Sequence, residues 1–489
     1  MTARLPRFFF HWPDLIWAGG AILIGLAAGL LSPLWALFLL GLLIAAPLFA
    51  ISPLAALGAM LILAPLRTLV STEAAFKPPL DSGQITFLLY LASWAVDRIT
   101  HRQPLLHFKP SPVYVPILIF TAAGGLTAWS ALSLGSWITE WLKWWIVLAM
   151  IYTLHSMGRS AWTWIVGLLT VAAVGNALVG IYIFFGGSGA DHLVILGRFF
   201  RAFGTFGQPN PFGGFLGLLT PLALMMSYGY VQRIWVYYRV TRTWPRQDIA
   251  LLLFYLGSAG LMLTGILMSW SRGAWLGLAI SSAVMAFAMP RKIWQSILVT
   301  TALIGTVFAL WVGGLLPASI VTRLTTSAAE FITIEDVRGV EITNDNYAVI
   351  ERLAHWQAAV NMAQDYPWLG VGLGNYEIAY DRYRLMFWTF PLGHAHNYYL
   401  NILAEAGIIG VLSYLAMGVG LIRLTWRLRH NPDLLIRAAG IGLLGAWAYL
   451  AVHSLLDNLY VNNVFLHLGA LLGVLAILTE LTWSHLTWE

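Results

Sequence analysis

Arginine side chains stand out in two short stretches of an otherwise apolar sequence. Arg198 and Arg201 lie in GRFFRAFGTFGQPNPFGGFL, and Arg272 lies in LMSWSRGAWLGLAI with apolar residues on both sides. A charge at membrane depth is costly, so it usually pairs or faces a cavity. A guanidinium offers five fixed donors that suit phosphate oxygens. The arginines are therefore candidates for phosphate binding, whereas the alternative for Arg272 is a structural ion pair or a side chain that reaches the membrane surface.

Guanidinium groups placed in advance can stabilise the charge that develops on a phosphate oxygen when a pyrophosphate leaving group departs. This chemistry needs no metal. The chain contains neither an Asp-Asp nor an Asp-x-Asp motif of the kind that holds Mg²⁺. We therefore expect a site that works without a metal or another cofactor.

Two histidines precede a long apolar run in GHAHNYYLNILAEAGIIGVL. His396 stands directly before Asn397, a good helix-capping residue, so it is expected at the start of a helix. The positive end of a helix disfavours imidazolium, and a neutral imidazole can take a proton from a hydroxyl group. His394 can share a side with His396 only in an extended segment. A zinc site needs a further ligand, and Glu405 and His355 are expected to lie too far away. An interfacial histidine without chemistry remains the alternative.

Two other charged residues are weaker candidates. Arg352 lies in IERLAHWQAAV, where its residue type alone indicates a solvated helix charge paired with an acidic residue. Asp457 lies in VHSLLDNLYVNN, at the end of an apolar run, with His453 one turn earlier. Its carboxylate can orient an arginine or a histidine, or can simply be a polar group at a helix end.

The elements that carry these residues are membrane helices. Of the 489 residues, 59% are hydrophobic and 10% are charged, whereas a soluble domain has about 25% charged residues. The 24 Trp and 19 Tyr residues fit aromatic belts at two membrane interfaces. The net charge of +6 is explained better by basic cytoplasmic loops than by nucleic-acid binding. The absence of cysteine excludes disulfides, thiolate metal sites and a cysteine nucleophile.

We expect an all-α polytopic membrane protein with about 12–14 transmembrane helices, since a spanning helix needs about 20 mostly apolar residues. The first span is expected to be an anchor and not a cleaved signal peptide. The candidate segments cover residues 14–31, 33–50, 53–70, 84–99, 112–131, 137–156, 161–186, 211–230, 249–269, 272–289, 293–315, 397–424, 434–456 and 461–482.

The basic loops predict the orientation of the chain. Placing both termini in the cytoplasm also places the short basic connections there. The long loop, residues 316–396, then lies on the external face with nine of the 21 acidic residues. Three parts follow: N-terminal spans in 1–315, the external loop in 316–396 and C-terminal spans in 397–489. We expect an inner-membrane protein whose active site faces the periplasm or exterior.

Two features are expected inside the long loop. Residues 350–364 form an amphipathic helix, with Leu353, Trp356, Val360 and Ala363 at helical spacing. Residues 370–375, Gly-Val-Gly-Leu-Gly-Asn, follow as a tight turn. They lack the flanking strand that a dinucleotide-binding motif requires.

Taken together, these stretches resemble the O-antigen ligases and the related O-antigen polymerases. The resemblance covers about residues 195–480. It depends on five motifs in order: AFGTFGQPNPFGGFL, SRGAWLGL, ERLAHWQAAV…DYPWLGVGLGNY, HAHNYYLNILAEAGIIGVL and HSLLDNLY. The first 190 residues resemble the family only in being hydrophobic.

The resemblance implies a membrane glycosyltransferase of the GT-C type. Such an enzyme moves a glycan from undecaprenyl pyrophosphate to a hydroxyl acceptor, which is lipid A-core for ligases and another repeat unit for polymerases. It also implies that His396 activates the acceptor. Arg272, Arg352 and Arg201 or Arg198 would bind the pyrophosphate, with Asp457, Asn397 and His394 in support.

Relatives of this family have also been described as bicarbonate transporters, and arginines can line an anion pathway as well as bind a leaving group. A transporter should carry polar residues at mid-membrane depth and discontinuous helices. The distinctive residues here cluster towards one face instead, which favours the transferase.

Overall fold

The computed structural model describes residues 52–73, 80–187, 193–315, 321–322, 336–343 and 346–483. Two expected spans, residues 14–31 and 33–50, lie outside this part. In the described part the chain is mostly helical, with only one short β-hairpin. The expectation of an all-α polytopic membrane protein is confirmed.

The described residues contain fifteen α-helices, three short 3₁₀ or π helices and one short hairpin. The two strands, β1 (Val194–Ile195) and β2 (Phe199–Phe200), are antiparallel. The helices are α3 (Pro53–Leu63), α4 (Arg67–Glu73), α5 (Ser82–Thr100), α6 (Tyr114–Leu126), α7 (Leu134–Ser156), α8 (Ala161–Tyr182), α9 (Pro209–Thr241), α10 (Arg246–Met268), α11 (Arg272–Ala288), α12 (Ile293–Val312), α14 (Tyr347–Asp365), α15 (Tyr376–Tyr383), α16 (Tyr398–Leu428), α17 (Leu434–His453) and α18 (Val464–Trp483).

Eight helical segments of the described part are long and apolar enough to cross a membrane. Two shorter apolar helices, Tyr114–Trp129 and Arg272–Ala288, accompany them. Every candidate span of the sequence that falls in the described part is helical. The eight segments are Pro53–Thr72, Ala161–Gly186, Pro209–Thr241, Arg246–Met268, Ile293–Val312, Tyr398–Leu428, Leu434–His453 and Val464–Thr482.

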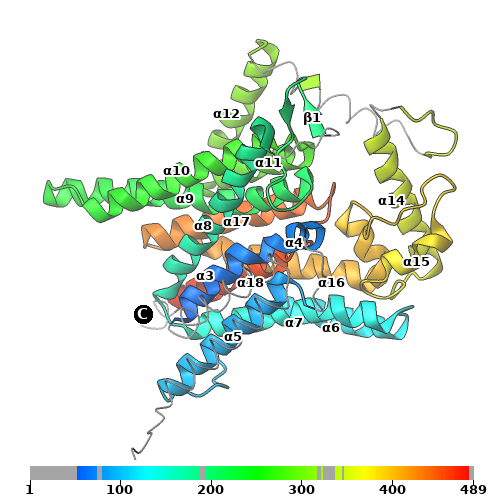
Figure 1. Cartoon of the computed structure of the whole chain (residues 1–489). Helices are drawn as coiled ribbons and strands as arrows, with labels where there is room; N and C mark the ends of the chain where they lie inside the picture. The colour runs from blue at the N-terminus through cyan, green and yellow to red at the C-terminus, as the bar shows by residue number, and fades with distance from the viewer. Residues whose placement is uncertain are drawn as a thin grey trace, which may run out of the picture.

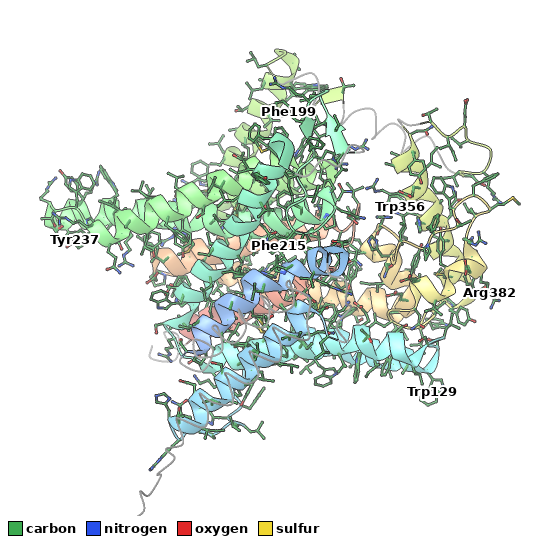
Figure 2. The ribbon with its side chains drawn as sticks, in the orientation of Figure 1. Trp129, Phe199, Phe215, Tyr237, Trp356 and Arg382 are labelled. Carbon is green, nitrogen blue, oxygen red and sulfur yellow. The ribbon has the colours of Figure 1, made fainter. Side chains whose placement is uncertain are left out.

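Most long helices run side by side in a bundle. We call the segment that carries α14 and α15, residues 346–397, the insertion, and it lies at one end of this bundle. Figure 1 shows α14 and α15 at the right-hand end. Figure 2 shows Trp129 and Arg382 at the same end as α14, and Tyr237 of α9 at the other. The bundle therefore has two distinct faces, and the insertion covers only one of them.

The centre of the bundle is the packing of α9 against α17. Glycines in α9 allow the close approach: a Cβ atom at Gly217 would overlap the Tyr449 ring. The Tyr449 hydroxyl donates a hydrogen bond to the Gly213 carbonyl at 2.9 Å. A polar group in a membrane helix must find its partner within the protein, so this bond fixes α17 against α9.

Residues 370–375 form the predicted glycine-rich turn, which packs against a break in α16. Gly407 has φ 62° and ψ −162° inside this helix. The Ala404 and Glu405 carbonyls accept hydrogen bonds from Val371 N and Gly372 N at 2.9 and 3.0 Å. Beyond the break, Ile408 N donates to the Pro367 carbonyl at 2.8 Å. The loop thus satisfies backbone groups that the broken helix leaves free.

The loop helix α14 begins and ends close to the expected limits, but its apolar face differs from the prediction. Leu353 and Ala363 are buried, whereas Val360 is 37% exposed. The buried side includes Ile350, Ala354 and His355. The prediction for Val360 is wrong because alanines, which carry a weak apolar signal, supply four of the nine buried residues of this helix.

Candidate active site

Three helix ends meet where the insertion joins the bundle: the start of α16, the end of α17 and the start of α11. Tyr398 N at the start of α16 donates to the Ser454 carbonyl at 2.8 Å, just after α17. A Cβ atom at Gly273 would lie 3.5 Å from His453 Nδ1, so α11 packs directly on the end of α17. Residues from distant parts of the sequence therefore surround one small volume.

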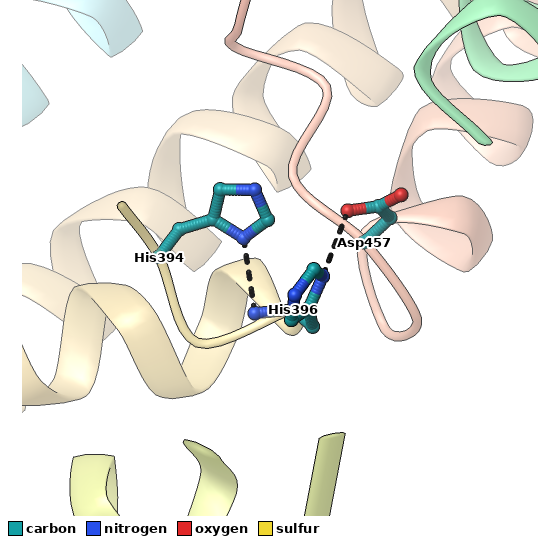
Figure 3. Close-up of side chains that lie close together, drawn as sticks. All are labelled: His394, His396 and Asp457. Atoms are coloured by element: carbon teal, nitrogen blue, oxygen red, sulfur yellow. Dashed lines mark hydrogen bonds and ion pairs between the residues drawn. The ribbon is translucent and has the colours of Figure 1, made fainter. Parts of the chain in front are cut away.

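His394, His396 and Asp457 form the centre of this volume (Figure 3). Nδ1 of His396 lies 3.5 Å from Oδ1 of Asp457, and the two side chains are 15% and 6% exposed. The backbone N–H of His396 donates to Nδ1 of His394 at 3.1 Å. The two histidines lie in a turn before α16 and not in the extended segment expected, since His396 has a left-handed backbone, and their ring centroids are 4.5 Å apart. Together these contacts orient the His396 ring towards the carboxylate.

The backbone at His396 is unusual. This residue has φ 52°, a left-handed conformation that few non-glycine residues adopt. Asn397 follows as the N-cap of α16, and its side chain accepts hydrogen bonds from Tyr399 N and Leu400 N at 3.0 and 3.1 Å. Asn397 therefore has a capping role, which holds His396 at the positive end of the helix.

His355 also lies in the site, although the sequence placed it too far away to contribute. Its ring centroid is 5.7 Å from that of His396 in an edge-on arrangement. Nδ1 of His355 and the Tyr376 hydroxyl are 2.9 Å apart, and the ring stacks on Tyr380 at 4.8 Å. Burial and the nearby His396 lower the pKa of His355 to about 3. The earlier view that His355 is remote is wrong because the insertion folds back over α16.

The protonation of the cluster follows from its burial. Burial and then His396 lower the pKa of His394 to about 4, with a further contribution from the Arg352 charge. For Asp457, burial alone would raise the pKa, but His396, His394 and His453 outweigh it and hold the pKa below its usual value. At neutral pH the cluster thus contains a neutral His394 and an ionised Asp457.

The expected arginines lie at the edges of this volume in different ways. Nε of Arg201 donates to the Ser269 carbonyl at 3.1 Å, and one of its terminal nitrogens lies 3.4 Å from the Trp270 carbonyl. These carbonyls lie two and three residues before Arg272, the first residue of α11. Arg201 and Arg272 are thus brought to the same junction, on the side of α17 that packs against α11.

Arg352 and Arg198 differ in their positions. Arg352 lies one helical turn before His355 and donates to the Ala348 carbonyl at 2.7 Å, and its charge acts on His394. Arg198 is exposed, and its guanidinium lies 4.4 Å from the centre of the Phe199 ring, which follows it in the hairpin. Of the two hairpin arginines, Arg201 is therefore the one held against the α10–α11 junction.

His453 completes the surroundings of Asp457. It is fully buried, and Asp457 N donates to its carbonyl at 3.0 Å. Gly214 of α9 also borders its ring, because a Cβ atom there would lie 3.0 Å from Nε2. The sequence singled out His453 only as a neighbour of Asp457 one turn away, and that spacing was the available signal.

The cluster also has the composition of a metal site. One ligand atom each of His394, His396 and Asp457 lie within 4.8 Å of one another. Ligands of tetrahedral zinc, at about 2.0 Å from the ion, are separated by about 3.3 Å. The three side chains would thus have to move closer to bind zinc. The expectation of a site without a metal remains a prediction.

Comparison with known families bears on this arrangement. Residues 257–415 match the family model described as O-antigen ligase. This segment is similar to the O-antigen ligase family. It includes Arg272, Arg352, His394, His396 and Asn397, whereas Arg198, Arg201 and Asp457 lie outside it. No curated protein matches the chain.

The match of this segment to the O-antigen ligase family supports a membrane enzyme that transfers a glycan in O-antigen biosynthesis. The matched segment runs from the middle of α10 into α16, so it contains the whole insertion. It also contains one side of the site, and the hairpin and the end of α17 supply the rest.

Proposed function

We propose that this protein transfers a glycan from undecaprenyl pyrophosphate to a hydroxyl acceptor on the external membrane face, as an O-antigen ligase. The observation that carries the proposal is the His396–Asp457 pair, 3.5 Å apart at the mouth of a membrane bundle whose matched segment is similar to that family. A polymerase would use the same donor chemistry and differ in its acceptor.

In this mechanism His396 is the general base. A proton on Nδ1 faces Asp457, which leaves the Nε2 lone pair to take the proton of the acceptor hydroxyl. As that O–H bond breaks, the hydroxyl oxygen forms a bond to the sugar C1 and the C1–phosphate oxygen bond breaks on the opposite side. The anomeric configuration is thereby inverted.

The leaving pyrophosphate carries away the electron pair of the broken bond, so negative charge grows on its oxygens. Arg201, Arg272 and Arg352 are assigned to stabilise this charge through charge-assisted hydrogen bonds. The support for this assignment is that Arg201 and Arg272 share one junction and that the Arg352 charge acts on His394. Fixed guanidinium groups supply this stabilisation without a metal.

The proposal is tested by transfer with the purified protein, a synthetic polyprenyl-pyrophosphate oligosaccharide, EDTA and a panel of hydroxyl acceptors. We expect acceptor-dependent release of polyprenyl pyrophosphate by the wild type. We expect a loss of at least about 100-fold in His396→Ala and in Arg272→Ala, the usual size of a lost acid–base or charge-stabilising group.

The acceptor that supports turnover distinguishes lipid A-core ligation from polymerisation. Activity that disappears with EDTA and returns with zinc would contradict the mechanism without a metal. Bicarbonate flux that depends on Arg272 in proteoliposomes, together with no turnover on any acceptor, would contradict the transferase itself.

A further inference from the structure

A second group of arginines lies at the opposite ends of the helices that form the active site. α11 and α16 begin at the His396 site and α17 ends there, so Arg291 after α11, Arg429 after α16 and Arg437 in the first turn of α17 lie at the far end. We call these three residues the distal arginine cluster. Its position separates it from the transfer chemistry.

Arg429 is the centre of this cluster and is only 3% exposed. One terminal nitrogen donates to the Pro290 and Arg291 carbonyls at 3.0 and 3.2 Å. The guanidinium lies over the Trp426 ring, 4.1 Å from its centre. Its other two nitrogens, Nε and Nη1, are buried without a hydrogen-bond partner.

Arg437 repeats this pattern on the neighbouring helix. One of its terminal nitrogens donates to the Met289 carbonyl, while its Nε is buried without a hydrogen-bond partner. In each guanidinium, one nitrogen has hydrogen-bond partners among the carbonyls after α11, as expected for a cation at the negative end of a helix. They leave three buried donor atoms unexplained, and buried donors in proteins nearly always have a partner.

The cluster also lacks a balancing negative charge in the part of the chain that the structure describes. No carboxylate there lies within ion-pair distance, 4.0 Å, of Arg291, Arg429 or Arg437. The acidic residue nearest in sequence, Asp433, accepts hydrogen bonds from Leu435 N and Ile436 N as the cap of α17. Burial, followed by the Arg437 charge, lowers the pKa of Arg429. An external anion would relieve this accumulation of positive charge.

We propose that the distal arginine cluster binds a phosphate group at the membrane surface. Guanidinium groups match phosphate oxygens, and three of them supply both the donors and the charge. The cluster follows directly on membrane-spanning helices and borders Trp426, a residue type typical of the membrane interface. The phosphate can come from the headgroup of an anionic phospholipid or from free phosphate, and the two sources are separable by experiment.

The test measures lipid retention by native mass spectrometry, with phosphatidylglycerol titrated onto the full-length protein in a neutral detergent. We expect wild type to retain this lipid about tenfold more tightly than Arg429→Gln, which corresponds to one lost charge-assisted contact. Arg423→Gln is the matched control, because Arg423 is an exposed arginine of α16 near the same end. It should bind like the wild type.

Inorganic phosphate is titrated in parallel, with thermal unfolding as the readout. Stabilisation by phosphatidylglycerol alone identifies a lipid site, whereas equal stabilisation by inorganic phosphate identifies a site for the free anion. Arg291→Gln serves as a second variant, because this exposed side chain can be changed without disturbing the fold. Equal binding of both probes by wild type, Arg291→Gln and Arg429→Gln, or an equal loss in Arg423→Gln, would overturn the proposal.

Discussion

Asp457 acts on the proposed chemistry through its neighbour and not through the substrate. Its carboxylate faces Nδ1 of His396 at 3.5 Å. In the proposed mechanism this contact selects the tautomer whose Nε2 can accept a proton. Removing its charge while keeping its shape should therefore misorient the base without emptying the site. The expected effect depends on one contact, between Oδ1 of Asp457 and Nδ1 of His396.

We predict that Asp457→Asn lowers kcat by about 100-fold or more with a much smaller change in KM, as expected for a lost partner of a general base. The measurement is steady-state glycan transfer with varied acceptor. Asp365→Asn is the control, because it makes the same substitution at an exposed position. The Asp365 carboxylate lies 3.8 Å from Arg382. Equal activity of wild type and Asp457→Asn would remove this carboxylate from the mechanism.

Two histidines of the site, His394 and His355, make stability depend on pH. The pKa values of His394 and His355 are lowered to about 4 and 3, so the unfolded chain binds protons below about pH 6.5 that the folded chain does not. Stability therefore falls as pH falls from 7 to 5, by about 2 kcal/mol for each histidine. Asp457, whose pKa is also lowered, releases its proton below this window and adds no slope there.

Thermal unfolding in lipid nanodiscs at pH 7 and pH 5 measures this loss. His394→Gln should reduce the difference between the two pH values, since the uncharged side chain cannot take up the proton. The exposed His101 supplies the control substitution, His101→Gln, which should leave the difference unchanged. The idea fails if His394→Gln and wild type lose the same stability on acidification.

At the scale of elements, the site depends on how the insertion docks onto α16. The break at Gly407 frees backbone groups, and the glycine-rich turn binds them. The same segment carries Tyr376, whose backbone N–H donates to Glu405 at 3.1 Å and whose hydroxyl is bonded to His355. The insertion thus holds His355 against His396 through a contact on the His355 ring and through backbone contacts at the break in α16.

We predict that Gly370→Ala disrupts this docking. Gly370 has φ 64°, and a Cβ atom there would lie 2.5 Å from the Ala404 carbonyl oxygen. Strain and overlap together should cost several kcal/mol, seen as a lower melting temperature and lost transfer. Gly418→Ala in α16 is the control, because its Cβ would meet no atom within 4 Å. A neutral Gly370→Ala would show that the turn adapts freely.

The sequence predicts elements of this kind unequally. Apolar runs of spanning length predict helices, and each run in the described part is helical. The break at Gly407 gives no such signal, since glycine is common in membrane helices. The sequence also gives no signal that His355 lies in the site. Its position depends on how the insertion folds back over α16, and local sequence patterns do not predict that contact. Arg352 was selected only through the resemblance to a family.

At the scale of the whole molecule, the bundle has one face that carries the insertion and another that carries the distal arginine cluster. The helices α11, α16 and α17 connect the two faces. The basic loops of the sequence predict which face is external, and the structure separates the two faces without assigning either to a compartment. Orientation is therefore a prediction about the molecule in its membrane, to be measured there.

The absence of cysteine makes this measurement direct, because each introduced cysteine is the sole thiol. Arg382→Cys and Trp129→Cys place a thiol at the insertion end, and Val240→Cys places one at the other end, three residues beyond Tyr237 (Figure 2). Trp129 and Val240 are 93% and 79% exposed, so both positions are accessible to a reagent.

We predict that a membrane-impermeant maleimide labels Arg382→Cys and Trp129→Cys in spheroplasts, and labels Val240→Cys only after the membrane is opened. The reason is that the short basic connections follow the cytoplasmic end of the helices, and the Val240 end leads into one of them. Retained glycan transfer by each variant shows that the thiol reports on a folded protein. Labelling of Arg382→Cys only after the membrane is opened would place His396 on the cytoplasmic side. An external acceptor hydroxyl could not reach it there, and this result would contradict the proposed reaction.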